Sequence, residues 1–260
     1  MKRLKDAQKD AKIERIQRID RGKDFGRFGL DARRLFVDET RYHIEPLCEH
    51  IRKYKSLGDL VEIADVGGGN GILAKAVLDE LGEEYPHLTI DLLDLDDSKF
   101  PNGEKRIRYV VHDAREPLGK QYDALLARSM LHYNTPAEQK QIIAEMATGT
   151  RAGGLVTIVQ PTPMSRKNKK EINGLYDLLC GMKSSNKKCW LTLAEITRLV
   201  ERSGLQIQES KWLENGKYTV DGFYKERYKL SDEEIEKVRT YLAGRPGVYM
   251  PTSVITAIRR

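Results

Sequence analysis

The 260-residue sequence has few cysteines, no long apolar run and no cluster of metal-binding side chains, and each absence excludes a class of protein. Its three cysteines, Cys48, Cys180 and Cys189, are too few and too irregularly spaced for a disulfide framework or a zinc site. The five histidines are scattered, and no apolar run reaches the roughly 18 residues that a membrane span needs. We therefore expect reduced cysteines, no metal and no transmembrane segment.

The composition also limits the architecture. With 40% apolar and 32% charged residues, the chain is typical of a globular protein, and its length favours one domain with additions over two full domains. Its basic start is not followed by the apolar core of a signal peptide, which predicts a cytoplasmic protein. The net charge of +6 is spread along the chain, which favours an ordinary solvated surface over a nucleic-acid-binding block.

What the sequence does contain is a glycine-rich loop between an apolar run and a helix-like run. Residues 61–66 predict a strand, the loop reads Gly67-Gly68-Gly69-Asn70-Gly71, and residues 72–78 predict a helix. Glycines at the alternate positions 67, 69 and 71 allow positive φ angles and close approach of a ligand. The helix that follows presents unpaired N–H groups to that ligand. The arrangement predicts a cofactor of the adenosine type.

This loop lacks the glycine that a dinucleotide fingerprint needs at its sixth position, where Ile72 stands, and this argues against NAD. The pattern that remains, Asp65-x-Gly67-x-Gly69-x-Gly71, resembles the first motif of class I S-adenosylmethionine-dependent methyltransferases. The resemblance implies that the loop passes under the methionine part of S-adenosylmethionine. It also implies that Asp65 helps to hold the ammonium group of that cofactor.

Strand-like and helix-like patterns alternate through the rest of the chain. They predict an α/β fold, a Rossmann-like doubly wound sheet of seven mainly parallel strands. We expect a helical extension over residues 1–56, then a cofactor-binding domain over 57–260 with a helical insertion at about 213–250. After the first strand, further strands are expected at residues 89–93, 106–111, 124–127, 155–159, 206–212 and 253–258. Capping boxes predict helix starts at Thr135 with Glu138, Thr192 with Glu195, and Ser231 with Glu234.

Two aspartates follow successive strands at positions that suit the adenosine part of a cofactor. Asp94 ends the second apolar run and can accept hydrogen bonds from both ribose hydroxyls, with Asp96 as the alternative. The neighbouring Leu95 is included in the predicted cofactor-binding set. The resemblance implies that Asp113 accepts a hydrogen bond from the adenine amino group and that the N–H of Ala114 reaches a ring nitrogen.

From Asp94 onward the chain is similar to small-molecule O-methyltransferases, chiefly through residues 113–118, 122–132 and 153–159. This resemblance implies that Arg128 contributes to the cofactor pocket and that His132 is the general base. An imidazole suits that task because it titrates near neutral pH. The chain continues His132-Tyr133-Asn134 where the family reads His-Asp-Trp, so a structural role for His132 in the pocket stays open as the alternative.

The acceptor site is predicted from aromatic residues, namely Tyr133, Tyr218, Phe223 and Tyr224, whose alternative role is packing of the insertion. The expected activity is methyl transfer to a small molecule, with a hydroxyl oxygen preferred over carbon or nitrogen. The chain lacks the Asn/Asp-Pro-Pro-Tyr motif and the Pro-Cys pair of nucleic-acid methyltransferases, so nucleic acid is disfavoured as a partner. An RNA or protein methyltransferase and a non-catalytic cofactor-binding homologue remain the alternatives.

A thin apolar stripe over residues 4–21 predicts a further helix among many charges. It is compatible with docking on the domain surface, a lid over the active site, a homodimer contact or an anchor on an anionic surface.

Overall fold

The computed structural model describes residues 44–96, 104–183, 188–213 and 217–260. The helix predicted at residues 4–21, and most of the predicted extension, lie outside these ranges. The first described element is a helical segment over residues 44–54. In the part of the chain that the structure describes, no helix is both long and apolar enough to cross a membrane.

One sheet of seven strands forms the centre of the described structure, in the order β3-β2-β1-β4-β5-β9-β6. Strands β1 to β5 run parallel, and β9 is antiparallel to both of its neighbours. The predicted Rossmann-like sheet of mainly parallel strands is therefore confirmed. The strands are β1 (Val61–Val66), β2 (Leu88–Asp94), β3 (Ile107–Val111), β4 (Tyr122–Arg128), β5 (Thr150–Pro161), β6 (Leu205–Leu213) and β9 (Thr252–Arg259).

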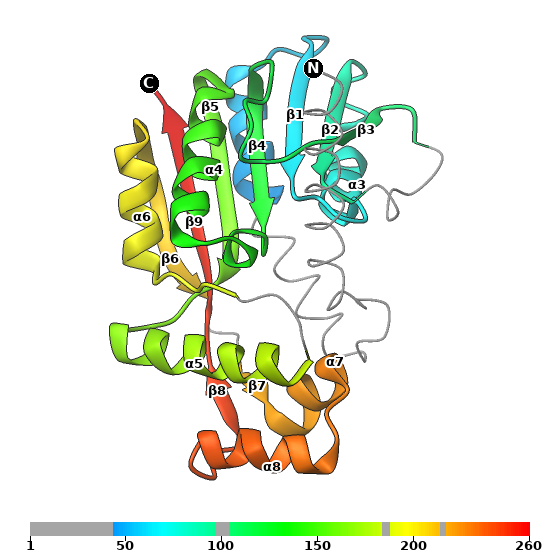
Figure 1. The fold of residues 1–260 in the computed structure, drawn as a ribbon. Coiled ribbons are helices and arrows are strands. Elements are labelled where there is room, and N and C mark those ends of the chain that lie inside the picture. Colours follow the sequence, from blue (N-terminus) through cyan, green and yellow to red (C-terminus); the bar gives the residue numbers. More distant parts are fainter. Residues whose placement is uncertain (1–43, 97–103, 184–187, 214–216) are drawn as a thin grey trace, which may run out of the picture.

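Helices cover both faces of this sheet (Figure 1). The segment 44–54 and α3 (Ile72–Leu81) lie on one face, while α4 (Pro136–Thr148) and α6 (Leu193–Arg202) lie on the other. Successive residues of a strand point to opposite faces, so Ile63 joins the core under α3 and Ala64 joins the core under α4 and α6. Burial on both faces explains why these strands read as nearly continuous apolar runs.

The capping boxes predicted from sequence are present at the starts of α4, α6 and α8 (Asp232–Tyr241). In each, the hydroxyl of the cap residue accepts the backbone N–H of a glutamate three positions later, and that glutamate reaches back to the cap N–H. The caps are Thr135, Thr192 and Ser231. Each cap contributes about 1 kcal/mol of stability.

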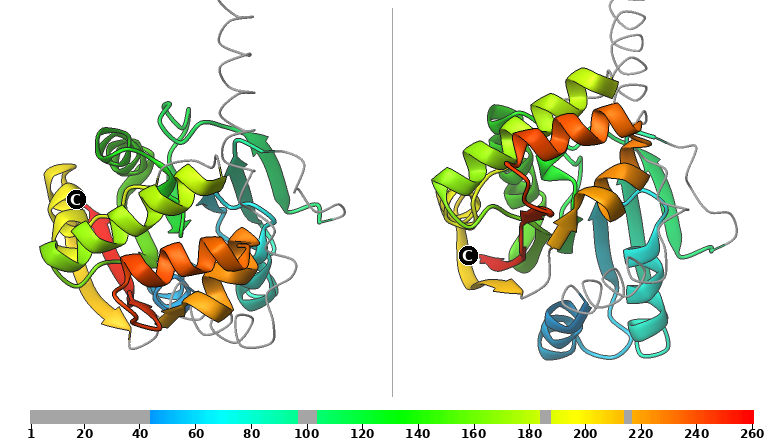
Figure 2. Two further views of the ribbon diagram at one scale, coloured as in Figure 1. Left: turned by 60° about the horizontal axis from the view of Figure 1, so that its bottom comes forward. Right: turned by 90° about the horizontal axis from the view of Figure 1, so that it is seen from below.

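A smaller layer lies beyond the carboxyl ends of the parallel strands, and it has its own apolar core. Its helices α5 (Arg166–Lys183) and α8 lie side by side (Figure 2). The layer is completed by β7 (Lys217–Thr219), the π-helical turn η4 (Val220–Tyr224), α7 (Lys225–Tyr228) and β8 (Gly247–Tyr249). Helix α5 comes from the connection after β5, so the layer combines the segment predicted as an insertion with an earlier part of the chain.

Candidate active site

The carboxyl ends of β1, β2 and β4 meet in the middle of the sheet, where the chain order of the strands reverses. Loops that leave β1 and β4 diverge at this point, and such switch points bind ligands in open α/β sheets. The glycine loop follows β1, Asp94 ends β2, Asp113 follows β3 and Arg128 ends β4. The structure therefore brings the predicted cofactor-binding residues to one edge of the sheet.

The glycine loop has the backbone that the sequence predicts. Gly67, Gly69 and Gly71 have φ angles of 69°, 56° and 73°, in the left-handed region that favours glycine. The N–H groups of Gly67 and Gly68 donate to the carbonyl oxygen of Leu93 at 2.7 and 3.3 Å, which fixes the loop to β2. A Cβ added to Gly69 would have no atom within 4 Å, so the loop leaves open space at that position.

Gly68 is a position that the motif analysis missed. A Cβ there would lie 2.8 Å from the Cγ atoms of both Asp65 and Leu92, so only glycine lets the loop lie directly on the end of β1. Met130 packs against the loop from the other side, because a Cβ on Gly67 would lie 2.8 Å from the Cβ of Met130. The uninterrupted run of three glycines was the available signal, since the alternate-glycine motif does not require the middle one.

Asp65 is 1% exposed, and its Oδ2 has no hydrogen-bond partner among the described residues. Burial raises the pKa of this carboxyl to about 7. The positive charge of Arg128 and the N–H of Ala74 oppose that rise, and the negative charge of Asp94 adds to it. A buried carboxylate oxygen of this kind is stabilised by a cation, so the position suits the ammonium group of an amino acid.

Asp94 connects the end of β2 to the glycine loop. Its Oδ2 accepts the N–H of Gly69 at 2.9 Å, and its Oδ1 accepts the N–H of Asp96 at 3.0 Å. Each carboxylate oxygen can accept a further hydrogen bond, so Asp94 retains capacity for two hydroxyl groups. Asp96 is also buried, at 7% exposure, but it lies beyond the strand end. This geometry fits Asp94 better than Asp96 to the ribose position.

Asp113 is held by a residue that the sequence analysis did not assign. The guanidinium group of Arg115 donates from Nη2 to Oδ2 of Asp113 at 2.6 Å and from Nε to Oδ1 at 3.0 Å. Arg115 also pairs with Glu138 of α4. An adenine amino group bound to Asp113 would therefore share the carboxylate with Arg115, which already holds it in place. Ala114, the next residue, packs against the core under α4. The Asp-x-Arg spacing was the signal for this pair.

The turn after β4 carries backbone strain. Ser129 has a φ of 49°, which costs a residue with a Cβ about 1–2 kcal/mol, and its N–H donates to the carbonyl oxygen of Val159 at 2.9 Å. Strained backbone is concentrated at functional sites. The short helix η3 (Leu131–Tyr133) follows this turn and carries His132.

His132 lies where the sheet meets the smaller layer. It is 4% exposed, its ring stacks on Trp190 with the centroids 3.9 Å apart, and it contacts the ring of Tyr133 at 4.2 Å. Trp190 is held in turn by α5, since its backbone N–H donates to Oδ1 of Asn173 at 2.9 Å. The sequence analysis missed Trp190 and Asn173, because only the fold brings residues 132, 173 and 190 together.

The predicted acceptor residues have two different surroundings. Tyr133 is in ring contact with His132, and its hydroxyl accepts a hydrogen bond from Nη2 of Arg227 at 3.1 Å. Tyr218, Phe223 and Tyr224 pack together in the core of the smaller layer, and Tyr224 is fully buried. Packing thus accounts for the position of these three residues, while Tyr133 lies beside the proposed base.

Comparison with known proteins identifies the family. A model of the O-methyltransferase domain matches residues 31–206. The chain belongs to this O-methyltransferase domain family. It is an S-adenosylmethionine-dependent methyltransferase, as the motifs predict. No curated protein matches the chain.

Solved structures share the fold of this methyltransferase at low sequence identity. The YcgJ protein of Bacillus subtilis is 14% identical, with a TM-score of 0.65, covering 86% of this chain and 99% of that protein. The geranyl diphosphate C-methyltransferase of Streptomyces coelicolor A3(2) is 13% identical, with a TM-score of 0.58, covering 88% and 80%. The [4+2]-cyclase SpnF is 13% identical, with a TM-score of 0.51, covering 82% and 80%.

The residues at the sheet edge fit S-adenosylmethionine. The unpartnered Oδ2 of Asp65 suits an ammonium group, the two oxygens of Asp94 suit ribose hydroxyls, and the space at Gly69 admits a ligand. Across the described ranges, no group of three or more His, Cys, Asp or Glu side chains is arranged to hold a metal ion.

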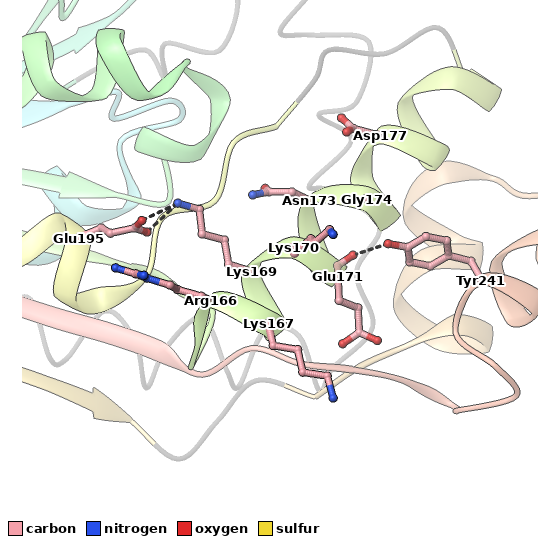
Figure 3. A pocket seen from close by; sticks show the side chains of 10 residues that line it. All are labelled: Arg166, Lys167, Lys169, Lys170, Glu171, Asn173, Gly174, Asp177, Glu195 and Tyr241. Carbon is pink, nitrogen blue, oxygen red and sulfur yellow. Dashed lines mark hydrogen bonds and ion pairs between the residues drawn. The ribbon is translucent and has the colours of Figure 1, made fainter.

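A hollow is lined mainly by α5, with Glu195 of α6 and Tyr241 of α8 (Figure 3). It is an open groove of about 810 Å³, and Lys169 in it pairs with Glu195 of α6 at 2.7 Å. The groove includes Asn173 but none of the residues predicted for cofactor or acceptor. Its lining is Arg166, Lys167, Lys169, Lys170, Glu171, Asn173, Gly174, Asp177, Glu195 and Tyr241.

Proposed function

We propose that this methyltransferase transfers a methyl group to a hydroxyl oxygen of a small molecule held between the sheet edge and the smaller layer. The observation that carries the proposal is the position of His132, stacked on Trp190 and beside Tyr133 where the two layers meet. A base at this place can reach an acceptor that touches residues from both layers.

The methionine part of the cofactor is assigned to the end of β1. Asp65 binds the ammonium group, and the glycine loop lies under the methionine part, with Gly67, Gly69 and Gly71 allowing the close approach. The charge of Arg128 favours the ionised form of Asp65. S-adenosylmethionine supplies an electrophilic methyl group when it is bound.

The adenosine part is assigned to the ends of β2 and β3. Asp94 accepts hydrogen bonds from the ribose hydroxyls, and Leu95 lies beside it in the chain. Asp113 receives the adenine amino group while Arg115 holds its carboxylate in place. The N–H of Ala114 donates to a ring nitrogen of adenine.

His132 acts on the acceptor. It accepts the proton of the acceptor hydroxyl, which makes the oxygen a better nucleophile, and such general-base catalysis is worth about 10²- to 10⁴-fold in rate. The stack on Trp190 fixes the plane of the imidazole, so the proton acceptor is already oriented before the reaction.

The first experiment supplies S-adenosylmethionine with a carbon-13 methyl group to the enzyme and to an extract separated into small molecules, nucleic acid and protein. Label in a small molecule is expected, and the chemical shift of the methyl carbon separates an oxygen-bound from a carbon-bound product. Carbon is the second candidate acceptor, because one protein of similar fold is a geranyl diphosphate C-methyltransferase. Label confined to RNA or protein would refute a small-molecule acceptor.

A pair of variants then tests the base. H132F keeps an aromatic ring against Trp190 but cannot accept a proton, so we expect turnover to fall by about 10²- to 10⁴-fold with nearly unchanged cofactor affinity. H87A removes an exposed histidine and serves as the matched control. If H132F keeps its turnover and the pH profile of the wild type, His132 is not the base.

A further inference from the structure

Three cations in the groove along α5 have no partner in the described part of the chain. Arg166, Lys167 and Lys170 line this groove, and all three are exposed. Among the described residues, none of them forms an ion pair or a side-chain hydrogen bond. Their charges and hydrogen-bond donors are therefore available to a partner from outside the chain. These three residues are called the α5 cations below.

The other charges of the groove do not offset the α5 cations. Lys169 pairs with Glu195 of α6 at 2.7 Å, and Glu171 pairs with Arg245, which follows α8. The remaining carboxyl group in the lining belongs to Asp177, which lies about two helical turns after the α5 cations. The end of the groove at the start of α5 is therefore positively charged.

The α5 cations are spread along the groove and do not converge on one point. Arg166 and Lys167 extend in different directions from the first turn of α5, and Lys170 follows one turn later (Figure 3). Four residues of an α-helix rise about 6 Å, and alternate residues of an extended chain lie about 6–7 Å apart. This spacing fits several acidic side chains of an extended segment better than a single compact anion.

The rest of the lining favours a protein segment as the occupant. The ring of Tyr241 is 39% exposed and offers an apolar contact. The carboxylates of Glu171, Asp177 and Glu195 can accept N–H groups of a peptide backbone, whereas the phosphates of a nucleic acid bring no donors and are repelled by them. The groove is also open, whereas sites for small molecules enclose most of their ligand.

The groove is close to the candidate active site. Asn173 is part of its lining, and Oδ1 of Asn173 accepts the backbone N–H of Trp190 at 2.9 Å. Trp190 in turn stacks on His132. A partner in the groove is thus connected to the proposed base through Asn173 and Trp190.

We propose that this groove is the docking surface for an acidic, extended segment of a partner protein, whose carboxylates pair with the α5 cations. The surface lies outside the residues proposed for the cofactor and the acceptor, so the inference does not rest on the proposed function. It predicts binding that depends on charge and that does not require methyl transfer.

A labelled peptide tests the docking surface. The full-length protein is titrated into rhodamine-labelled oligoglutamate, and fluorescence anisotropy reports binding. An oligoglutamine of the same length is the neutral reference, and an oligouridylate of the same length represents nucleic acid. We expect oligoglutamate to bind at least tenfold more tightly than either of them. Added salt should weaken its binding, because ions screen exposed charges.

A triple variant, R166Q/K167Q/K170Q, assigns this binding to the α5 cations. Each exposed ion pair is worth up to about fivefold in affinity, so the loss of three should weaken oligoglutamate binding about tenfold or more. The three side chains are exposed, so the variant should fold like the wild type, and thermal melting checks this.

The matched control makes the same change in net charge elsewhere on the surface. K105Q/K140Q/R202Q removes three exposed cations outside the groove and should bind oligoglutamate like the wild type. The proposal is overturned if R166Q/K167Q/K170Q keeps the wild-type affinity, if the control loses as much affinity, or if oligoglutamine binds as tightly as oligoglutamate. Tighter binding of oligouridylate would make nucleic acid the occupant and refute a protein segment. None of these results bears on His132, since binding is measured without cofactor.

Discussion

Replacing Gly68 by alanine tests whether the glycine loop lies on Asp65 as tightly as the structure shows. The new Cβ would lie 2.8 Å from the Cγ atoms of Asp65 and Leu92 and 2.9 Å from Oδ2 of Asp65. Both neighbours are buried in strands of the parallel sheet, with exposures of 1% and 0%, so neither can move aside easily. Overpacking of this kind costs about 1–3 kcal/mol, and we expect G68A to lower the free energy of unfolding by that amount.

Gly69 provides a comparison, because a side chain at this position is disfavoured by the backbone conformation and not by contact with other atoms. Its φ is 56°, but a Cβ would have no atom within 4 Å. G69A should therefore lose only the cost of left-handed backbone, about 1 kcal/mol, while its methyl group enters the space assigned to the cofactor. We expect the larger loss of stability in G68A. In G69A the loss of S-adenosylmethionine affinity should exceed the loss of stability.

The two quantities need separate assays. Urea unfolding gives the free energies of unfolding, provided that their slope against urea concentration is the same in the variants as in the wild type. Calorimetric titration with S-adenosylmethionine gives the affinities. G69N is the control for backbone strain, since asparagine tolerates the left-handed region better than alanine does. A G68A variant as stable as the wild type and with the same affinity would show that the loop does not rest on Asp65. Greater destabilisation by G69A than by G68A would show that strain, not contact, controls the loop.

Three further predictions concern the same edge of the sheet. D94A should weaken S-adenosylmethionine binding about tenfold or more in calorimetry, because the ribose hydroxyls and the N–H of Gly69 lose their acceptor; unchanged affinity would move the role to Asp96. Because the pKa of Asp65 is raised to about 7 and an ammonium ligand favours its ionised form, cofactor affinity should rise with pH up to about 7 and then level off. D65N should give a flat profile, and a flat wild-type profile would contradict the role. Without cofactor, a rise in pH has the opposite effect, on the stability of the fold. An unfolded aspartate ionises near pH 3.9, so between that pH and about pH 7 the carboxyl of Asp65 increasingly lowers the free energy of unfolding. Above about pH 7, D65N should therefore be more stable than the wild type. S129G should raise the free energy of unfolding by about 1 kcal/mol, since glycine adopts the φ of 49° without strain; a loss in urea unfolding would mean that the side chain of Ser129 contributes more than its backbone costs.

Local patterns predicted the sheet and its sequence of elements, because the central strands β1, β2 and β4 are buried on both faces and the starts of α4, α6 and α8 carry their own caps. The strand ends were less accurate. The predicted strand at residues 155–159 extends in the structure from Thr150 to Pro161, since Thr150 pairs with Tyr122 of β4. Arg151, Gly153 and Gly154 interrupt the apolar run there, and only the neighbouring strand shows that the backbone stays extended.

The candidate site likewise contains residues that local sequence patterns indicate and residues that only the tertiary packing brings together. The glycine loop and Asp94 lie within a short stretch around a strand end, so the sequence alone was enough to predict a cofactor-binding role for them. Trp190 and Asn173 could not be found, because their contact with His132 depends on how α5 packs above the sheet edge. Arg115 was missed for another reason: a salt bridge to Asp113 is as common in a structural turn as in a binding site, so spacing alone does not assign it.

The residues proposed for the cofactor and those proposed for the acceptor therefore come from different parts of this methyltransferase. The residues proposed for S-adenosylmethionine all come from the ends of β1 to β4, and the backbone of the parallel sheet fixes their relative positions. The residues proposed for the acceptor come from two layers, because the stack joins His132 from the turn after β4 to Trp190, which α5 holds through Asn173. A change in α5 or in the segment 217–250 can thus alter which acceptor fits without disturbing the glycine loop.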